Sequence, residues 1–230
     1  MGERSMVMRY GKNVGRKFYE NGDARAFHGN TVVADVLEGS DAYGVMTALR
    51  DMVLEEGFDT HLILMPADSY HMTVIRGVND QVRCEGYWPP NLPMDMPMEL
   101  VDDYMEAAIK SVEMPKSVMM KFDRIKLSDG DVEVLLVPAD EEQNQKLRTY
   151  RDQAAEAIGF FLPKHKDYRF HITLAYVRVI AEGENEVRMN AMIDRMNVYI
   201  ANRPAFEITN PYVAFYKDML AFSPTRIPRP

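Results

Sequence analysis

The sequence contains very little cysteine and no long hydrophobic run. Cys84 is the single cysteine in 230 residues, so no disulfide can form within the chain, which is typical of a reducing compartment. No apolar stretch approaches the roughly 20 residues needed to cross a bilayer. The first residues are charged and lack the apolar core of a signal peptide, and Met6 stands where the myristoylation pattern requires serine or threonine. We therefore expect a cytoplasmic protein without membrane contact.

Positive charge and metal-ligand patterns are also scarce. The 27 lysines and arginines against 35 acidic residues give a net charge of −8. Affinity for a long nucleic acid depends on lysine and arginine neutralising phosphates, so a small nucleotide or a short RNA end fits this chain better as a partner. Spacings such as H-E-x-x-H or C-x-x-C do not occur. We expect no metal and no other cofactor.

The polarity pattern predicts alternating helices and strands in one sizeable core, with 47 % apolar residues. The predicted strands are 31–37, 61–65, 70–76, 118–127, 132–137, 169–176 and one or two within 205–222. The predicted helices are 42–55, 99–112, 140–158 and 184–201. Residues 61–65 and 70–76 look like a hairpin, and 77–96 like a long proline-rich loop of the kind that often covers a binding site. We predict an N-terminal arm at 1–28, a single domain at 29–222 and a tail at 223–230.

One short phrase occurs twice. The two copies are His71-Met72-Thr73-Val74 and His171-Ile172-Thr173-Leu174. Each lies in a run rich in β-branched and aromatic residues, as is typical of a strand. Because side chains at i and i+2 share a face of a strand, each histidine points the same way as its threonine. A cleft is the simplest place for such a polar face, since buried polar groups need hydrogen-bond partners.

The paired phrases resemble those of the two-histidine (2H) phosphoesterase superfamily, which includes LigT-type 2′-5′ RNA ligases and cyclic phosphodiesterases. The stretches 29–33, 87–89 and 168–176 resemble a little-characterised branch of it, and the resemblance spans roughly 10–222. It implies a bilobal α+β fold, LigT-like, with two antiparallel sheets and flanking helices around a central cleft. Alternating helices and strands with one phrase in each half point to the same arrangement.

The two phrases supply the groups that phosphodiester hydrolysis needs. Histidine titrates near neutrality, so His71 and His171 can act as general acid and general base, in an order that the sequence does not decide. The hydroxyls of Thr73 and Thr173 can donate to a non-bridging phosphate oxygen as charge develops.

Three further residues are candidates for substrate contacts. Arg169 lies two residues before His171, so alternation places it on the same face, where it either holds phosphate or faces solvent. Trp88 lies in the long loop and either stacks on a nucleobase or plugs the loop against the core. Tyr168 has the alternation of a core residue but precedes the strand, where alternation is a poor guide.

We therefore predict a metal-independent phosphodiesterase that hydrolyses a small cyclic (2′,3′-type) or 2′-5′-linked nucleotide phosphodiester. One alternative is RNA-end processing or 2′-5′ RNA ligation, which requires a basic channel. A second alternative is a nucleotide-binding module without catalysis. We expect a monomer with no protein partner.

Overall fold

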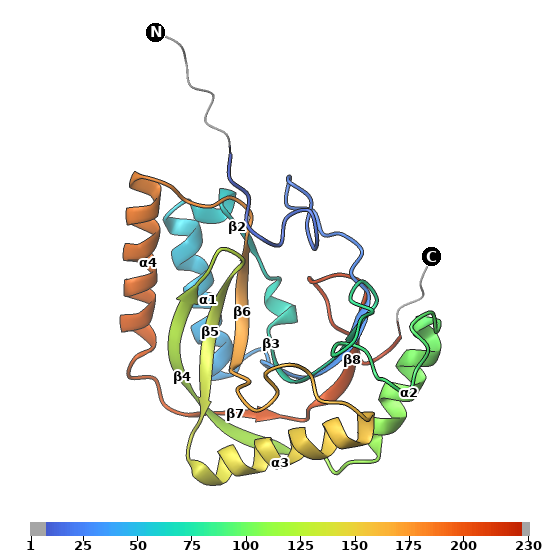
Figure 1. Ribbon diagram of the computed structural model, residues 1–230. Coiled ribbons are helices and arrows are strands. Elements are labelled where there is room, and N and C mark those ends of the chain that lie inside the picture. Colours follow the sequence, from blue (N-terminus) through green and yellow to red (C-terminus); the bar gives the residue numbers. More distant parts are fainter. Residues whose placement is uncertain (1–7, 227–230) are drawn as a thin grey trace.

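The computed structural model describes residues 8–226, in which helices surround one curved antiparallel sheet (Figure 1). Parts of the predicted arm and tail, 1–7 and 227–230, lie outside the described residues. The strands are β1 (Gly29–Asp35), β2 (Leu62–Leu64), β3 (His71–Asn79), β4 (Ser117–Leu127), β5 (Asp131–Pro138), β6 (Phe170–Val177), β7 (Phe206–Thr209) and β8 (Tyr212–Tyr216). The helices are α1 (Asp41–Glu55), α2 (Met98–Lys110), α3 (Glu141–Ile158) and α4 (Glu184–Ile200), with short 3-10 turns η1 (Phe58–Thr60) and η2 (Ala67–Ser69). The predicted α+β class is confirmed.

Local sequence signals set the ends of the helices. The Ser40 side chain caps α1 by accepting from the backbone N–H of Tyr43, and Asp140 caps α3 in the same way through Gln143. Helix α3 ends at Gly159, whose φ of 86° is strained for any residue with a side chain. The predicted helix boundaries therefore agree with the structure to within two residues.

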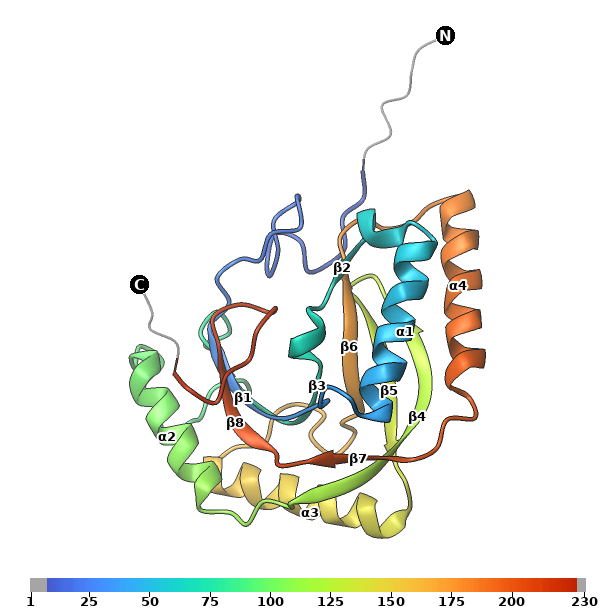
Figure 2. The same cartoon turned by 180° about the vertical axis from the view of Figure 1, so that it is seen from behind.

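The helices cover the two halves of the sheet in pairs (Figures 1 and 2). Helices α1 and α4 lie side by side and contact β6 and β4, respectively. Helices α2 and α3 contact each other, and they pack on β1 and β8 and on β3, β4 and β5, respectively. No helix within residues 8–226 is long and apolar enough to span a membrane.

All the strands belong to one sheet, where two sheets were predicted. Its order is β7-β4-β5-β6-β3-β1-β8, with β2 paired beside β6. The two halves join where β3 meets β6, through the single antiparallel pair Met72 and Ile172, both of which are 0 % exposed. Because this buried pair connects the two motif strands directly, the two halves form one continuous sheet.

The predicted hairpin of 61–65 with 70–76 is wrong. Strand β2 pairs with β6, with Leu62 opposite Val177 and Leu64 opposite Ala175. The β6 strand runs beyond its contact with β3 and offers a free edge there, while η2 redirects the chain before β3 begins. Local turn residues could not reveal this long-range partner.

The two motif strands are built alike, with residue numbers offset by 100. Asp35 lies opposite His71 in the β1–β3 pair, and Leu135 lies opposite His171 in the β5–β6 pair. In each pair the register slips by one residue directly after the motif threonine. The last residue of each phrase is thus the extra residue of a β-bulge.

The bulges change which side chains face the core. Val74 and Ile75 are both buried, as are Leu174 and Ala175, with exposures of 0–3 %. By simple alternation, Arg76 and Tyr176 would point away from the histidines and into the core. The extra residue reverses this, so Arg76 and Tyr176 come back to the face that carries the histidines.

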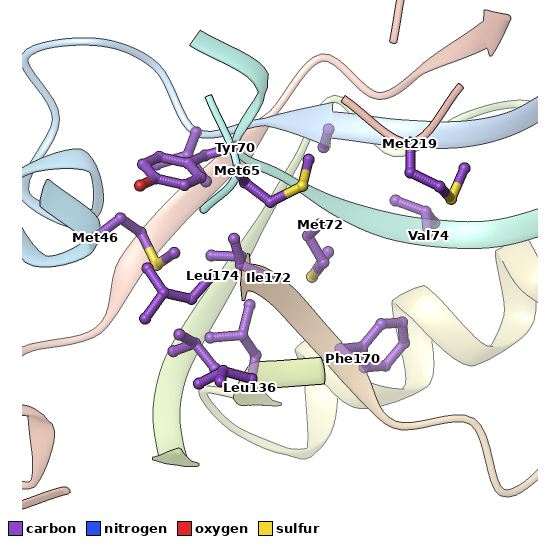
Figure 3. Close-up of a cluster of buried hydrophobic side chains, with 14 of the residues drawn as sticks. Met46, Met65, Tyr70, Met72, Val74, Leu136, Phe170, Ile172, Leu174 and Met219 are labelled. Atoms are coloured by element: carbon purple, nitrogen blue, oxygen red, sulfur yellow. The ribbon is translucent and has the colours of Figure 1, made fainter. Parts of the chain in front are cut away.

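The opposite face of the motif strands forms the centre of the core (Figure 3). Met72, Val74, Ile172 and Leu174 are each 0 % exposed and pack with Tyr70, Phe170, Leu136, Met46 and Met65. The predicted alternation of polar and apolar faces is confirmed. Burying each large apolar side chain stabilises the fold by about 1.5–3 kcal/mol, so the core holds both motif strands in place.

Residues 8–28 pack along the sheet. The N–H of Gly11 donates to the carbonyl of Arg178 over 2.9 Å, and Tyr10 bridges to Val179. A side chain at Gly11 would lie 2.1 Å from the carbonyl oxygen of Val177, so this contact requires glycine. Phe18 and Phe27 are buried, at 0 % and 5 % exposure. This packing fixes the position of Arg16 and Lys17, which lie between Gly11 and Phe18.

Candidate active site

One cavity of about 580 Å³ contains all four polar side chains of the two motifs. His71 and Thr73 reach it from β3, and His171 and Thr173 reach it from β6. We call it the motif cavity. Since β3 and β6 are antiparallel about the Met72–Ile172 pair, His71 lies on the side of Thr173, and Thr73 on the side of His171. The four groups therefore form a local twofold arrangement.

Each histidine is oriented by the same local hydrogen bond. The Nδ1 atom of His71 lies 2.7 Å from the carbonyl oxygen of Ser69, and that of His171 lies 3.0 Å from the carbonyl oxygen of Arg169. A carbonyl only accepts, so Nδ1 carries the proton in both rings. Each ring therefore has Nε2 as the nitrogen available to exchange a proton with a ligand.

The surroundings of the two rings differ. The ring of Phe222 lies 4.1 Å from that of His71, centroid to centroid. Burial lowers the pKa of His71 to about 4, with the neighbouring His171 acting in the same direction and the Ser69 hydrogen bond opposing both. His71 is therefore neutral at pH 7.

His171 has a carboxylate beside it. Its Nε2 atom lies 3.5 Å from Oε1 of Glu133, whose Oε2 atom accepts from Nζ of Lys126 over 2.9 Å. Because Nδ1 of His171 already carries a proton, Nε2 can donate to Glu133 only when the ring is the doubly protonated cation. The Glu133 carboxylate is therefore the charged group next to the Nε2 atom of His171.

The three predicted substrate contacts lie in different places. Tyr168 lines the motif cavity, and its hydroxyl donates to the carbonyl of Thr73 over 3.3 Å. Arg169 is exposed and lines an adjoining cavity of about 250 Å³, which shares His171 and Glu133 with the motif cavity. Trp88 is 3 % exposed, donates to the carbonyl of Pro93 and lines neither cavity.

Several cavity residues were absent from the sequence prediction. Glu133 reaches the motif cavity from β5, directly opposite Thr173, and Phe222 reaches it from the C-terminal segment. Arg76 was missed because the bulge reverses the alternation after Thr73. Lys17 was missed because 8–28 has no periodicity that predicts its packing.

Among residues 8–226, no group of three or more histidine, cysteine, aspartate or glutamate side chains is arranged to hold a metal ion. The polar groups that line the site include two imidazoles, two threonine hydroxyls and the carboxylates of Asp131 and Glu133.

The family comparison matches the first half of the chain. Residues 17–130 match the model of a 2H-phosphodiesterase family, described as a domain of unknown function (DUF1868). The match includes His71 but ends before His171. It confirms the resemblance to the 2H phosphoesterase superfamily that the paired motifs predict. No curated protein matches the chain.

Among solved structures, the chain is similar to a conserved protein of unknown function from Agrobacterium tumefaciens. The two are 29 % identical with a TM-score of 0.83, over 93 % of this chain and 91 % of that one. A phosphoesterase has 14 % identity and a TM-score of 0.47, over 88 % of this chain and 97 % of that one. LigT of E. coli complexed with NADP+ has 12 % identity and a TM-score of 0.43, over 87 % of this chain and 96 % of that one. These last two TM-scores are below 0.5 and carry no weight in the assignment.

The family match supports a 2H phosphoesterase, an enzyme of the phosphodiesterase type.

Proposed function

We propose that the protein hydrolyses a small cyclic (2′,3′-type) or 2′-5′-linked nucleotide phosphodiester without a metal ion. The observation that carries the proposal is the pair of histidines in one cavity, each with Nδ1 tethered to a carbonyl and Nε2 available. A cavity of about 580 Å³ suits a small-molecule ligand. Thr73 and Thr173 would donate hydrogen bonds to the non-bridging phosphate oxygens.

The two environments suggest which histidine is the base. His71 is neutral at pH 7 because its pKa is lowered to about 4, so its Nε2 can take a proton from water or from a ribose hydroxyl. His171 would then be the general acid, and its Nε2 atom lies 3.5 Å from Oε1 of Glu133, an acceptor for the Nε2 proton that a general acid carries. In the reaction, water attacks phosphorus, His71 accepts the proton of the water, and His171 gives its Nε2 proton to the leaving ester oxygen.

The test is hydrolysis by the purified protein with EDTA present. The panel contains 2′,3′- and 3′,5′-cyclic mononucleotides and 2′-5′-linked dinucleotides. We expect turnover of a 2′,3′-cyclic or 2′-5′-linked substrate, and a loss of about 10²-fold or more in His71→Ala and in His171→Ala, since each acid or base is worth that much. His61→Ala is the matched control, because His61 lines neither cavity.

Other outcomes would contradict the proposal. Normal turnover in both motif variants would rule out the two-histidine mechanism, and loss of turnover in EDTA that added metal restores would rule out metal independence. Binding of nucleotides without any product would favour a binding module. Salt-sensitive binding of RNA oligonucleotides without hydrolysis of the panel would favour RNA-end processing or ligation.

A further inference from the structure

Three cationic side chains line the motif cavity together with the histidines. Arg16 and Lys17 come from the N-terminal segment, and Arg76 comes from β3. This is a local concentration of positive charge in a chain whose net charge is −8. We call these three residues the basic cluster.

Within residues 8–226, Arg16, Lys17 and Arg76 form no ion pair and no side-chain hydrogen bond. One acidic residue of the cavity, Asp131, acts on Lys17 through its charge. The acidic residues on the same wall are already engaged, since Asp131 accepts from the hydroxyl of Ser128 over 2.5 Å and Glu133 contacts Lys126 and His171. The positive charge of the cavity is therefore available to a ligand.

Lys17 is held in place without being neutralised. Its ammonium lies over the rings of Tyr176, at 4.9 Å, and Phe27, at 5.4 Å. Burial lowers the pKa of Lys17 to about 8, and the nearby Arg16 and Arg76 act in the same direction while Asp131 opposes them. An anion bound among these side chains would relieve this mutual repulsion.

The bulge separates the basic cluster from the reacting phosphate. Thr73 lies opposite Val33 and Arg76 lies opposite Thr31, so with the bulge between them they are two partner positions apart, roughly 7 Å at about 3.3 Å per residue. This separation is on the scale of one nucleoside sugar, so an anion at Arg76 would be a second group of the same ligand. Arginine suits phosphate because its donors match two phosphate oxygens.

We propose that Arg16, Lys17 and Arg76 form a second anion subsite, which selects substrates that carry a terminal phosphoryl group besides the phosphodiester that is cleaved. This inference rests on the proposed function for the identity of the first group. Its own content is that the preferred substrate is a cyclic phosphodiester nucleotide with a 5′-phosphate.

The experiment compares adenosine 2′,3′-cyclic phosphate with and without a 5′-phosphate. We expect the wild-type kcat/KM to be about tenfold higher with the 5′-phosphate, and this preference to fall by about fivefold or more in Arg76→Gln and in Lys17→Met, as loss of a charge-assisted hydrogen bond implies. Arg25→Gln is the control, because Arg25 belongs to the same segment but lines neither cavity. Equal kcat/KM for both substrates, or an unchanged preference in both variants, would overturn the inference.

A binding measurement separates this inference from the proposed function. Calorimetric titration with inorganic pyrophosphate requires no turnover. Weaker binding of about fivefold or more in Arg76→Gln and Lys17→Met than in Arg25→Gln would support the subsite even if no nucleotide is hydrolysed. Equal binding by all three variants would overturn it, and thermal unfolding would verify that each variant is folded.

Discussion

At the scale of single residues, the site places two identical side chains in different surroundings. His71 and His171 share the tether through Nδ1, but one ring packs on Phe222 and the other faces Glu133. Burial disfavours the charged form of an imidazole, and it lowers the pKa of His71 to about 4. Environment, more than residue type, therefore distinguishes the proposed base from the proposed acid.

The pH dependence of kcat/KM tests this difference. A base must be neutral, so activity falls as the pH drops through its pKa in the free enzyme, which for His71 is about 4 and not the usual 6.5. We expect the acid limb of the profile near pH 4 in the wild type. In Phe222→Ala the ring is less buried, so the limb should move up toward 6.5. A wild-type limb at 6.5, or no movement in the variant, would contradict the role of His71.

At the scale of elements, a buried arginine ties α3 to the first bulge. Arg151 is 2 % exposed and donates to the carbonyl oxygens of Val74, the bulge residue, and His165. Its guanidinium also lies 4.1 Å from the ring centre of Tyr168. Both the β3 bulge and the loop before β6 thus depend on one side chain of α3.

Replacing Arg151 should loosen this connection. Arg151→Met keeps the apolar stem but leaves two carbonyls without their donor, at about 1–3 kcal/mol for each unpaired buried group. We expect the free energy of unfolding in urea to fall by roughly 2–6 kcal/mol. Arg203→Met is the control, since Arg203 is exposed and donates only to Tyr199. Equal stability of the two variants would show that Arg151 does not hold the bulge.

The elements also show how far sequence reasoning reached. Local periodicity and caps predicted the helices, and alternation placed His71 and Thr73 on one face of their strand. Alternation could not predict where it would be interrupted, so the bulge at Val74 and the position of Arg76 were missed. The pairing of β2 with β6 and the packing of 8–28 depend on distant residues, which local patterns do not encode.

At the scale of the whole molecule, the chain has a repeated core around one local twofold axis. The β1–β3 and β5–β6 pairs share register, bulge and motif at an offset of 100 residues. The helices that cover the two halves differ, as do the segments that complete the cavity. The symmetric part positions the histidines, and the asymmetric part makes their surroundings different. The predicted boundaries of the arm, domain and tail, the monomeric state and the cytoplasmic location stay predictions.

The most direct test of the central claim compares three variants in EDTA on the substrate that the panel identifies. If the histidines act as one acid–base unit, His71→Ala and His171→Ala should each lower kcat/KM by about 10²–10⁴-fold. The kcat/KM of the double variant should then lie only slightly below that of the less active single variant. Losses that multiply in the double variant would mean that the histidines act independently. Single variants with wild-type kcat/KM would contradict the two-histidine account altogether.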